Sequence, residues 1–176
     1  MAFRVTLSSL VIICLLCSGC YESKYPLGTS GAPIDTRLLK TWIEENPPAG
    51  DKPHRAALFK FNKTDYTVVF GNDNDTATIA RAYTTMIDSV PVLNMQGIES
   101  EKPSDRTFVF FKYAFSPDGS LQTWMISRES PLLENTEFSS QAAFAAYVKK
   151  HIHDGRLFGE LRRFKPDKDA SVKIFP

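Results

Sequence analysis

The three cysteines of the chain, Cys14, Cys17 and Cys20, have the spacing C-x-x-C-x-x-C. Such a spacing could hold a metal or an iron–sulfur cluster, because cysteine thiolates ligate both. A bacterial cluster-binding run needs a fourth cysteine, but Lys24 stands at its place and no cysteine follows Cys20. The three also lie in an apolar segment without a polar shell for a charged cluster. The sequence therefore argues against a cluster, and the lack of later cysteines argues against a disulfide framework.

Three histidines, His54, His151 and His153, are the other side chains that commonly bind a metal or move a proton. His151 and His153 lie two residues apart on a predicted helix, so they cannot chelate together as an i, i+4 pair would. The acidic stretch 71–78 could bind calcium, but a calcium loop starting at Asp73 would need glycine and glutamate where two threonines stand. The sequence therefore predicts no metal site.

Nucleophilic catalysis also lacks its usual motifs. The chain has no G-x-S-x-G turn, and its nine glycines are dispersed instead of forming a phosphate-binding loop. We predict no catalytic residue and no cofactor. A site of converging carboxylates remains open, and its candidates are Asp65, Asp75, Asp88, Glu99 and Glu134.

The first nineteen residues have the layout of a secretory signal. Arg4 supplies positive charge, an apolar stretch covers residues 5–17, and two small residues come just before Cys20. The apolar stretch is shorter than the roughly 20 residues of a membrane-spanning helix. Residues 1–19 are therefore predicted to be a signal peptide. A plain cleaved signal and an uncleaved anchor are the alternatives to the lipoprotein signal described next.

Ser18-Gly19-Cys20 resembles the end of the lipobox of bacterial membrane lipoproteins, in which an aliphatic residue, a small residue and a glycine or alanine precede the cysteine. Cys17 stands at the first position, where leucine is usual. The resemblance implies cleavage between Gly19 and Cys20 and lipidation of Cys20. Three acyl chains would anchor the protein firmly, because one chain alone binds only marginally. Tyr21 stands where an aspartate would signal inner-membrane retention, which implies the outer membrane, on its periplasmic side.

Composition indicates one folded domain. Of the 176 residues, 43% are hydrophobic and 23% are charged. The 21 basic residues are balanced by 20 acidic ones and form no basic stripe, so the sequence predicts no nucleic-acid partner. Residues 20–35 are rich in proline, glycine, serine and threonine and predict a flexible tether, and residues 36–176 are predicted to form a single β-domain.

Most of this domain has the pattern of β-strands. Aromatic and β-branched runs on either side of residues 62–65 predict one hairpin, and runs on either side of residues 116–119 predict another. The run 107–115 is apolar on nearly both faces, which predicts a strand buried on two sides, or one with a core on one side and a covering element on the other. The remaining predicted elements are a strand at 76–87, an α-helix at 139–153 and a last strand at 156–164.

Many short antiparallel strands, one late helix and a closing strand resemble the lipocalin-type (calycin) barrel. The lipocalin signature is Gly-x-Trp in the first strand, and here Trp42 fits while Lys40 replaces the glycine. The family also implies an arginine packed over that tryptophan by a cation–π contact, for which Arg162 or Arg163 is the candidate. The chain further resembles the uncharacterised lipocalin-like domains of bacterial lipoproteins, whose leader of the kind Y-x-S-x-Y-P-L-G matches residues 21–28. The implied fold is mainly β: a small antiparallel barrel with one helix near the C-terminus.

The domain has more large aromatic residues than one hairpin can hide. They predict either a filled core or a barrel lumen that takes a small apolar ligand. The candidate ligand-binding residues are Trp42, Phe59, Phe61, Phe70, Phe108, Phe110 and Trp124. The leading hypothesis is therefore a lipid-anchored envelope protein with a non-enzymatic binding domain. The alternatives are an accessory subunit that docks to another envelope protein and, third, a hydrolase.

Overall fold

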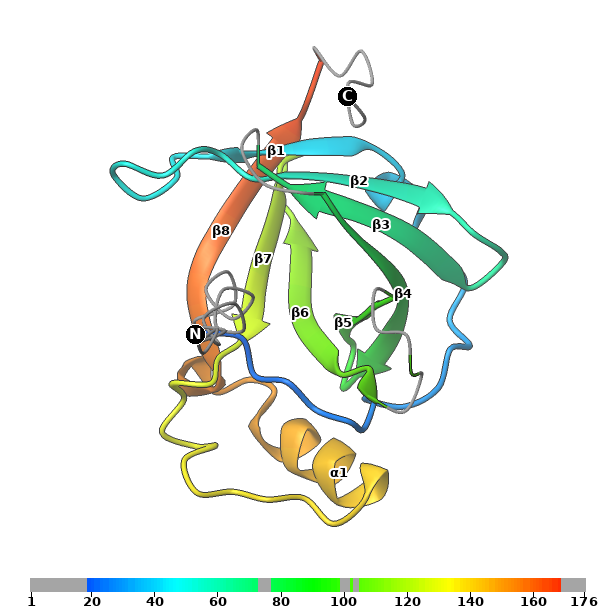
Figure 1. Ribbon diagram of the computed structural model, residues 1–176, viewed down its shortest axis with the longest axis vertical. Coiled ribbons are helices and arrows are strands. Elements are labelled where there is room, and N and C mark those ends of the chain that lie inside the picture. Colours follow the sequence, from blue (N-terminus) through cyan, green and yellow to red (C-terminus); the bar gives the residue numbers. More distant parts are fainter. Residues whose placement is uncertain (1–18, 73–76, 99–101, 103–104, 169–176) are drawn as a thin grey trace, which may run out of the picture.

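The computed structural model of the chain describes residues 19–72, 77–98, 102 and 105–168. Eight antiparallel strands form a closed barrel in chain order, with β8 pairing back onto β1 (Figure 1). The single α-helix of the described residues, α1 (Gln141–His151), stands between β7 and β8. This confirms the predicted lipocalin-like, mainly-β barrel with one late helix and a closing strand. The strands are β1 (Thr41–Glu45), β2 (Arg55–Lys60), β3 (Asp65–Gly71), β4 (Thr78–Ile87), β5 (Val90–Gly97), β6 (Phe108–Phe115), β7 (Leu121–Ile126) and β8 (Phe158–Pro166).

Local chemistry explains the turns and the start of the helix. Between β2 and β3, the side-chain oxygen of Asn62 accepts hydrogen bonds from the backbone N–H groups of Thr64 and Asp65. Between β6 and β7, Gly119 supplies a backbone φ of +81°, which residues with a side chain rarely adopt. The Ser140 hydroxyl accepts a hydrogen bond from Ala143 N–H and caps α1. Both predicted hairpins, the strand at 76–87 and the helix are confirmed.

The lumen of the barrel is filled by side chains. Residues paired across antiparallel strands share a face, and every second residue along a strand faces inward. Trp42 and Tyr66 are both fully buried in this layer. We call the buried set the lumen cluster: Leu38, Trp42, Leu58, Tyr66, Val68, Ala80, Ala82, Leu93, Met95, Tyr113 and Leu121.

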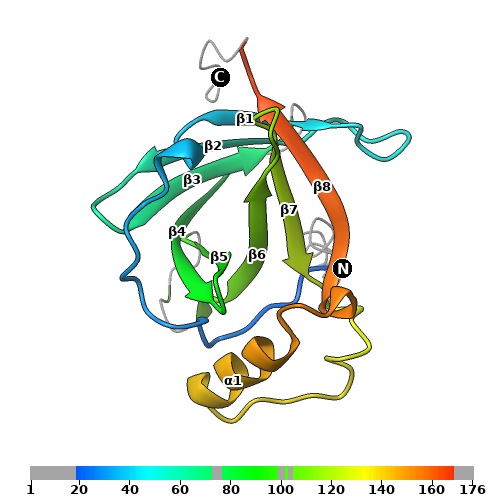
Figure 2. The same ribbon diagram turned by 180° about the vertical axis from the view of Figure 1, so that it is seen from behind.

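A second core lies on the outside of the barrel. The N-terminal segment and α1 cover the outer face of strands β4 to β7, and Figures 1 and 2 show that segment passing between α1 and the barrel. Phe110 is fully buried here, with its ring 5.2 Å from that of Phe144 in α1. Strand β6 therefore has a core on one side and a covering element on the other, as its apolar pattern predicts. The outer cluster is Leu27, Ile87, Val92, Phe110, Ile126, Leu133, Phe144, Val148, Ile152, Leu157 and Phe158.

The chain that leaves β7 at Ser127 and the start of β6 at Phe108 lie beside Cys20 and Ser23, and we call this end of the barrel the mouth. The β1–β2 connection (residues 46–54) lies away from it, because Arg163 of β8 contacts both Glu45 at the end of β1 and Ser120 in the β6–β7 turn. The β2–β3 turn (residues 61–64) and the β6–β7 turn (residues 116–120) share the other end, which we call the base.

Candidate functional site

Residues 20–35, which we call the strap, run along the outside of the barrel from the mouth to the base. At the mouth Tyr21 N–H donates to the carbonyl of Ile126 at 3.0 Å, and Ser23 pairs with Phe108 of β6. At the base Ile34 N–H donates to the carbonyl of Lys63 at 3.2 Å. The sequence predicts a flexible tether here, because proline, glycine and serine weaken regular structure. The structure instead holds the segment against the barrel through bonds to distant residues.

The leader motif at residues 21–28 supplies the middle of the strap. Leu27 is 1% exposed in the outer cluster, and its N–H donates to Asn94 Oδ1 at 2.7 Å. Gly28 has a backbone φ of +84°, and a Cβ atom there would lie only 3.0 Å from Thr85 Cγ2. Its carbonyl accepts hydrogen bonds from Tyr83 and Gln141, so the glycine allows the strap to bind both β4 and α1. The motif therefore has a packing role in this fold.

Cys20, the predicted lipidation site, lies at the mouth. It forms a β-bridge with Ser127, and the carbonyl of Gly19 accepts a hydrogen bond from Arg128 N–H at 2.8 Å. Its Sγ lies 2.8 Å from Sδ of Met125, which pairs with lumen-facing Phe111 and therefore points to the lumen side. The predicted cleavage site between Gly19 and Cys20 thus adjoins the end of β7.

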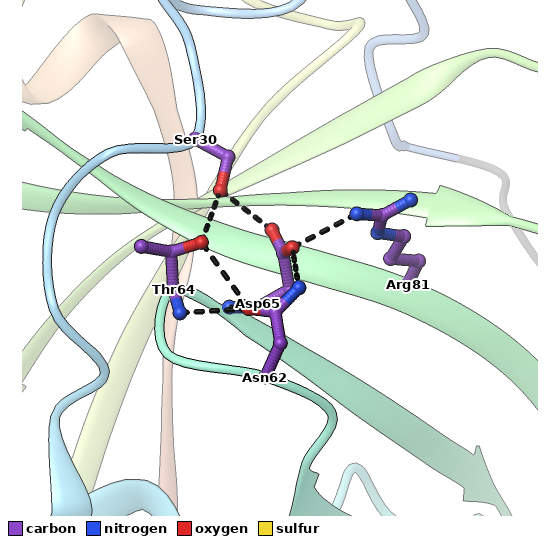
Figure 3. A network of polar contacts seen from close by, with 5 residues as sticks. All are labelled: Ser30, Asn62, Thr64, Asp65 and Arg81. Atoms are coloured by element: carbon purple, nitrogen blue, oxygen red, sulfur yellow. Dashed lines mark hydrogen bonds and ion pairs between the residues drawn. The ribbon is translucent and has the colours of Figure 1, made fainter.

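At the base the strap is held by a buried carboxylate. Asp65 is 2% exposed and accepts hydrogen bonds from Ser30 Oγ at 2.6 Å, Asn62 Nδ2 at 2.5 Å and Arg81 Nη2 at 2.8 Å (Figure 3). Burial alone would raise the pKa of Asp65, but hydrogen bonds from these three side chains and the Arg81 charge outweigh burial and lower it. The ionised form is therefore favoured, and it joins the strap, the β2–β3 turn and β4.

Asp65→Asn is expected to destabilise the fold at pH 7 by about 1–3 kcal/mol, because hydrogen-bond donors then face a neutral amide. The folded-state pKa of Asp65 is lowered, so the stabilisation is present above the unfolded-state value of about 3.9 and is lost as pH falls through the folded-state value. The gap in unfolding free energy between the two proteins should shrink from pH 7 to pH 3 in urea titrations. Asp88→Asn, at a half-exposed carboxylate, is the control and should give a much smaller gap. An Asp65→Asn gap that stays constant with pH would contradict this account.

A second polar cluster lies inside the barrel where β1 pairs with β8. Glu44 Oε2 is 2.7 Å from His54 Nδ1, and its Oε1 is 3.3 Å from Arg162 Nη1. The Glu44 side chain is only 3% exposed, whereas those of His54 and Arg162 are 34% and 47% exposed. Trp42 and Glu44 are two residues apart on β1, so both face inward. The cluster is thus a buried anion held by two cationic or polar groups that reach the solvent.

The Glu44–His54 pair has the same carboxylate–imidazole contact that occurs in catalytic triads. Within the described residues, the hydrogen-bond partners of the His54 ring are Glu44 and Arg162, neither of which is a nucleophile. Sequence reasoning considered His54 only by itself and missed the cluster. The alternation Trp42-x-Glu44 is the one local signal that places this carboxylate on the inward face. Among the described residues, no three His, Cys, Asp or Glu side chains come close enough together to hold a metal ion. Residues 73–76 of the calcium candidate 71–78, where its loop would begin, lie outside the described residues.

The seven aromatic candidates do not gather in one place. Trp42 and Phe70 face the lumen, where Trp42 belongs to the lumen cluster and Phe70 packs against it. Phe59 and Phe61 point outward and are 47% and 61% exposed. The other three pack into the outer cluster or against it: Phe108, Phe110 and Trp124.

The predicted arginine over Trp42 is replaced by a lysine. Lys40 Nζ lies 5.7 Å from the centroid of the Trp42 ring. Arg162 pairs with Glu44, and Arg163 binds Ser120 and other groups of the β6–β7 turn. Lys40, which stands where the lipocalin signature has glycine, thus provides the positive charge beside this tryptophan.

Two pockets of note lie on the outside of the barrel. The larger, about 390 Å³, is an open groove between the chain that follows β7, at Ser127 and Ser130, and the start of β8, at Phe158 and Gly159. The smaller, about 110 Å³, adjoins Asp65. Neither enters the lumen, because the lumen cluster fills it.

Within the described residues, no helix has the length and apolar character needed to cross a membrane. Comparison with protein-family models, with curated proteins and with solved structures finds no match to this chain.

Proposed function

We propose that this chain is a lipid-anchored protein of the bacterial cell envelope, held by acylated Cys20 in the outer membrane with its barrel in the periplasm, and that it acts by binding. The observation that carries the proposal is the position of Cys20. The residue that the lipobox resemblance marks for acylation is also the only cysteine of the described residues, and it lies at the edge of the fold, bridged to Ser127 at the end of β7.

The binding partner is another envelope protein, because the lumen has no room for a small apolar molecule. Trp42 and Tyr66 occupy the lumen with no exposed surface, and both pockets lie outside it. Small-molecule sites usually enclose about 300–1,000 Å³. The outward Phe59 and Phe61 on the β2–β3 hairpin instead present apolar surface to a partner. This favours the accessory-subunit alternative over a lumen ligand.

Mass spectrometry of the protein purified from membranes in mild detergent tests the anchor. We expect a mature N-terminus at Cys20 that carries three acyl chains, and loss of the protein from membranes after Cys20→Ser. Cys17→Leu, which restores the usual first lipobox residue, is the matched control and should be processed like the wild type. A mature N-terminus other than acylated Cys20 would remove the lipoprotein proposal.

Crosslinking in intact cells distinguishes a docked envelope protein from a small apolar ligand in the lumen. A protein adduct that Phe61→Ser weakens and Lys63→Ser leaves unchanged would support docking through the hairpin. Two results together would support the lumen ligand instead. A small molecule would co-purify with the protein in equal molar amount, and Phe61→Ser would leave the crosslinked adducts unchanged.

A further inference from the structure

The way the chain enters the barrel determines which part of the molecule can meet a membrane. We propose that the mouth of the barrel lies directly against the lipid bilayer that holds the anchor, with the base pointing away. This rests on the proposed anchoring at Cys20. It adds an orientation and a lipid-facing surface to that proposal.

The first support is the lack of slack between anchor and barrel. Cys20 itself pairs with Ser127, and Tyr21 N–H is bonded to Ile126. Ser23 and Phe108 exchange two backbone hydrogen bonds, at 2.7 and 3.0 Å. A free tether of residues 21–35 could extend to about 50 Å, at roughly 3.3–3.6 Å per residue. Because the strap is bound from its first residue, acyl chains on Cys20 start at the surface of the barrel.

The second support is the direction in which Cys20 points. Its side chain lies on the lumen side at Met125, whereas the next residue, Tyr21, packs into the outer cluster with its ring 5.7 Å from that of Phe144. Turning Cys20 away from the mouth would therefore withdraw the Tyr21 ring from the outer cluster. The acyl chains accordingly leave at the rim of the mouth, and the bilayer must lie there.

The third support is the character of the mouth. The inward side chains at this end include partly exposed Val109 and Phe111, which suit contact with a lipid surface. The occupant of the mouth is therefore the bilayer, and a protein partner is left with the base.

Hydrogen exchange on a vesicle-bound chain tests the orientation. The mature chain, residues 20–176, contains every described residue except Gly19 and has Cys20 as its only thiol. It is coupled through Cys20 to phosphatidylcholine vesicles that contain a maleimide-bearing lipid, after a cooperative thermal transition has shown it to be folded. We expect amide exchange at 127–131 to slow at least about threefold relative to the uncoupled chain, and exchange at 116–119 to stay unchanged.

Two variants make the result specific. Eight Gly/Ser residues inserted between Cys20 and Tyr21 free the anchor while keeping the strap, and should remove the slowing at the mouth. Lys63→Cys combined with Cys20→Ser moves the coupling to the base, and should slow exchange there instead. Slowing that is equal at both ends, or that persists with the inserted linker, would overturn the orientation. The chain is attached to the vesicle through maleimide chemistry and not through its native acyl chains. An unacylated native N-terminus would therefore refute the proposed anchor, but the exchange measurement would still report the orientation of the coupled chain.

Discussion

Trp42→Ala is expected to lower the free energy of unfolding by about 3–5 kcal/mol, the usual loss when a large aromatic residue is removed from a packed core. The Trp42 side chain has no exposed surface, and its Nε1–H donates to the carbonyl of Leu38 at 3.1 Å. Its loss leaves a cavity in the lumen cluster and removes one of the two hydrogen bonds to the Leu38 carbonyl, which still accepts from Lys40 N–H at 2.7 Å. For a chain of this size the melting temperature should fall by roughly 10 °C or more.

The matched control is Phe61→Ala, which removes an aromatic ring that is 61% exposed. Exposed substitutions usually change stability by less than about 0.5 kcal/mol, so the two variants should differ several-fold in chemical denaturation. A loss below about 1 kcal/mol for Trp42→Ala would mean that the lumen collapses around the gap, and would contradict a tightly filled barrel.

His54→Ala combined with Arg162→Ala is expected to cost about 3–5 kcal/mol, because it leaves the Glu44 carboxylate buried without a cation. The Glu44 side chain is 3% exposed, so its charge is held by protein groups and not by water. Adding Glu44→Gln to the double variant should restore at least about 2 kcal/mol, since a neutral amide needs no counter-charge. The largest loss of unfolding free energy is thus expected when His54 and Arg162 are truncated and Glu44 keeps its carboxylate.

Equilibrium unfolding in urea of the wild type, the double variant and the triple variant tests this order of stability. Arg55→Ala serves as the control, because Arg55 forms a partly exposed ion pair with Asp167 at 3.1 Å and such pairs contribute about 0–1 kcal/mol. If the triple variant is as unstable as the double variant, the loss comes from side-chain packing, and the electrostatic explanation is wrong.

The sequence predicts the hairpins and the helix well because their determinants are local. Asn62 and Gly119 make the turns, and Ser140 caps α1, all within a few residues of the groups they bind or position. The orientation of β6, by contrast, has no local determinant. A strand that is apolar on both sides does not reveal which side faces inward, so Phe110 is a lumen candidate by pattern and an outer-core residue in the fold.

The strap and the Glu44–His54–Arg162 cluster depend on contacts that a single sequence does not reveal. Leu27 binds Asn94 and Ser30 binds Asp65, across 67 and 35 residues of chain. Glu44 meets Arg162 across 118 residues, because β8 closes the barrel onto β1. Composition therefore suggests a loose tether where long-range bonds produce an ordered segment, and it gives no sign that His54 and Arg162 converge on one carboxylate.

The pairing of β1 with β8 also constrains how the protein folds. Trp42 lies opposite Pro166 in that ladder, so the first strand has no partner on one edge until nearly all of the chain has been synthesised. Contacts between such distant residues slow folding, and unpaired strand edges promote aggregation. The chain thus spends an interval as an open sheet with two free edges. During that interval it would benefit from a chaperone that shields edges, and a chain that stops before β8 should aggregate instead of accumulating as a stable fragment.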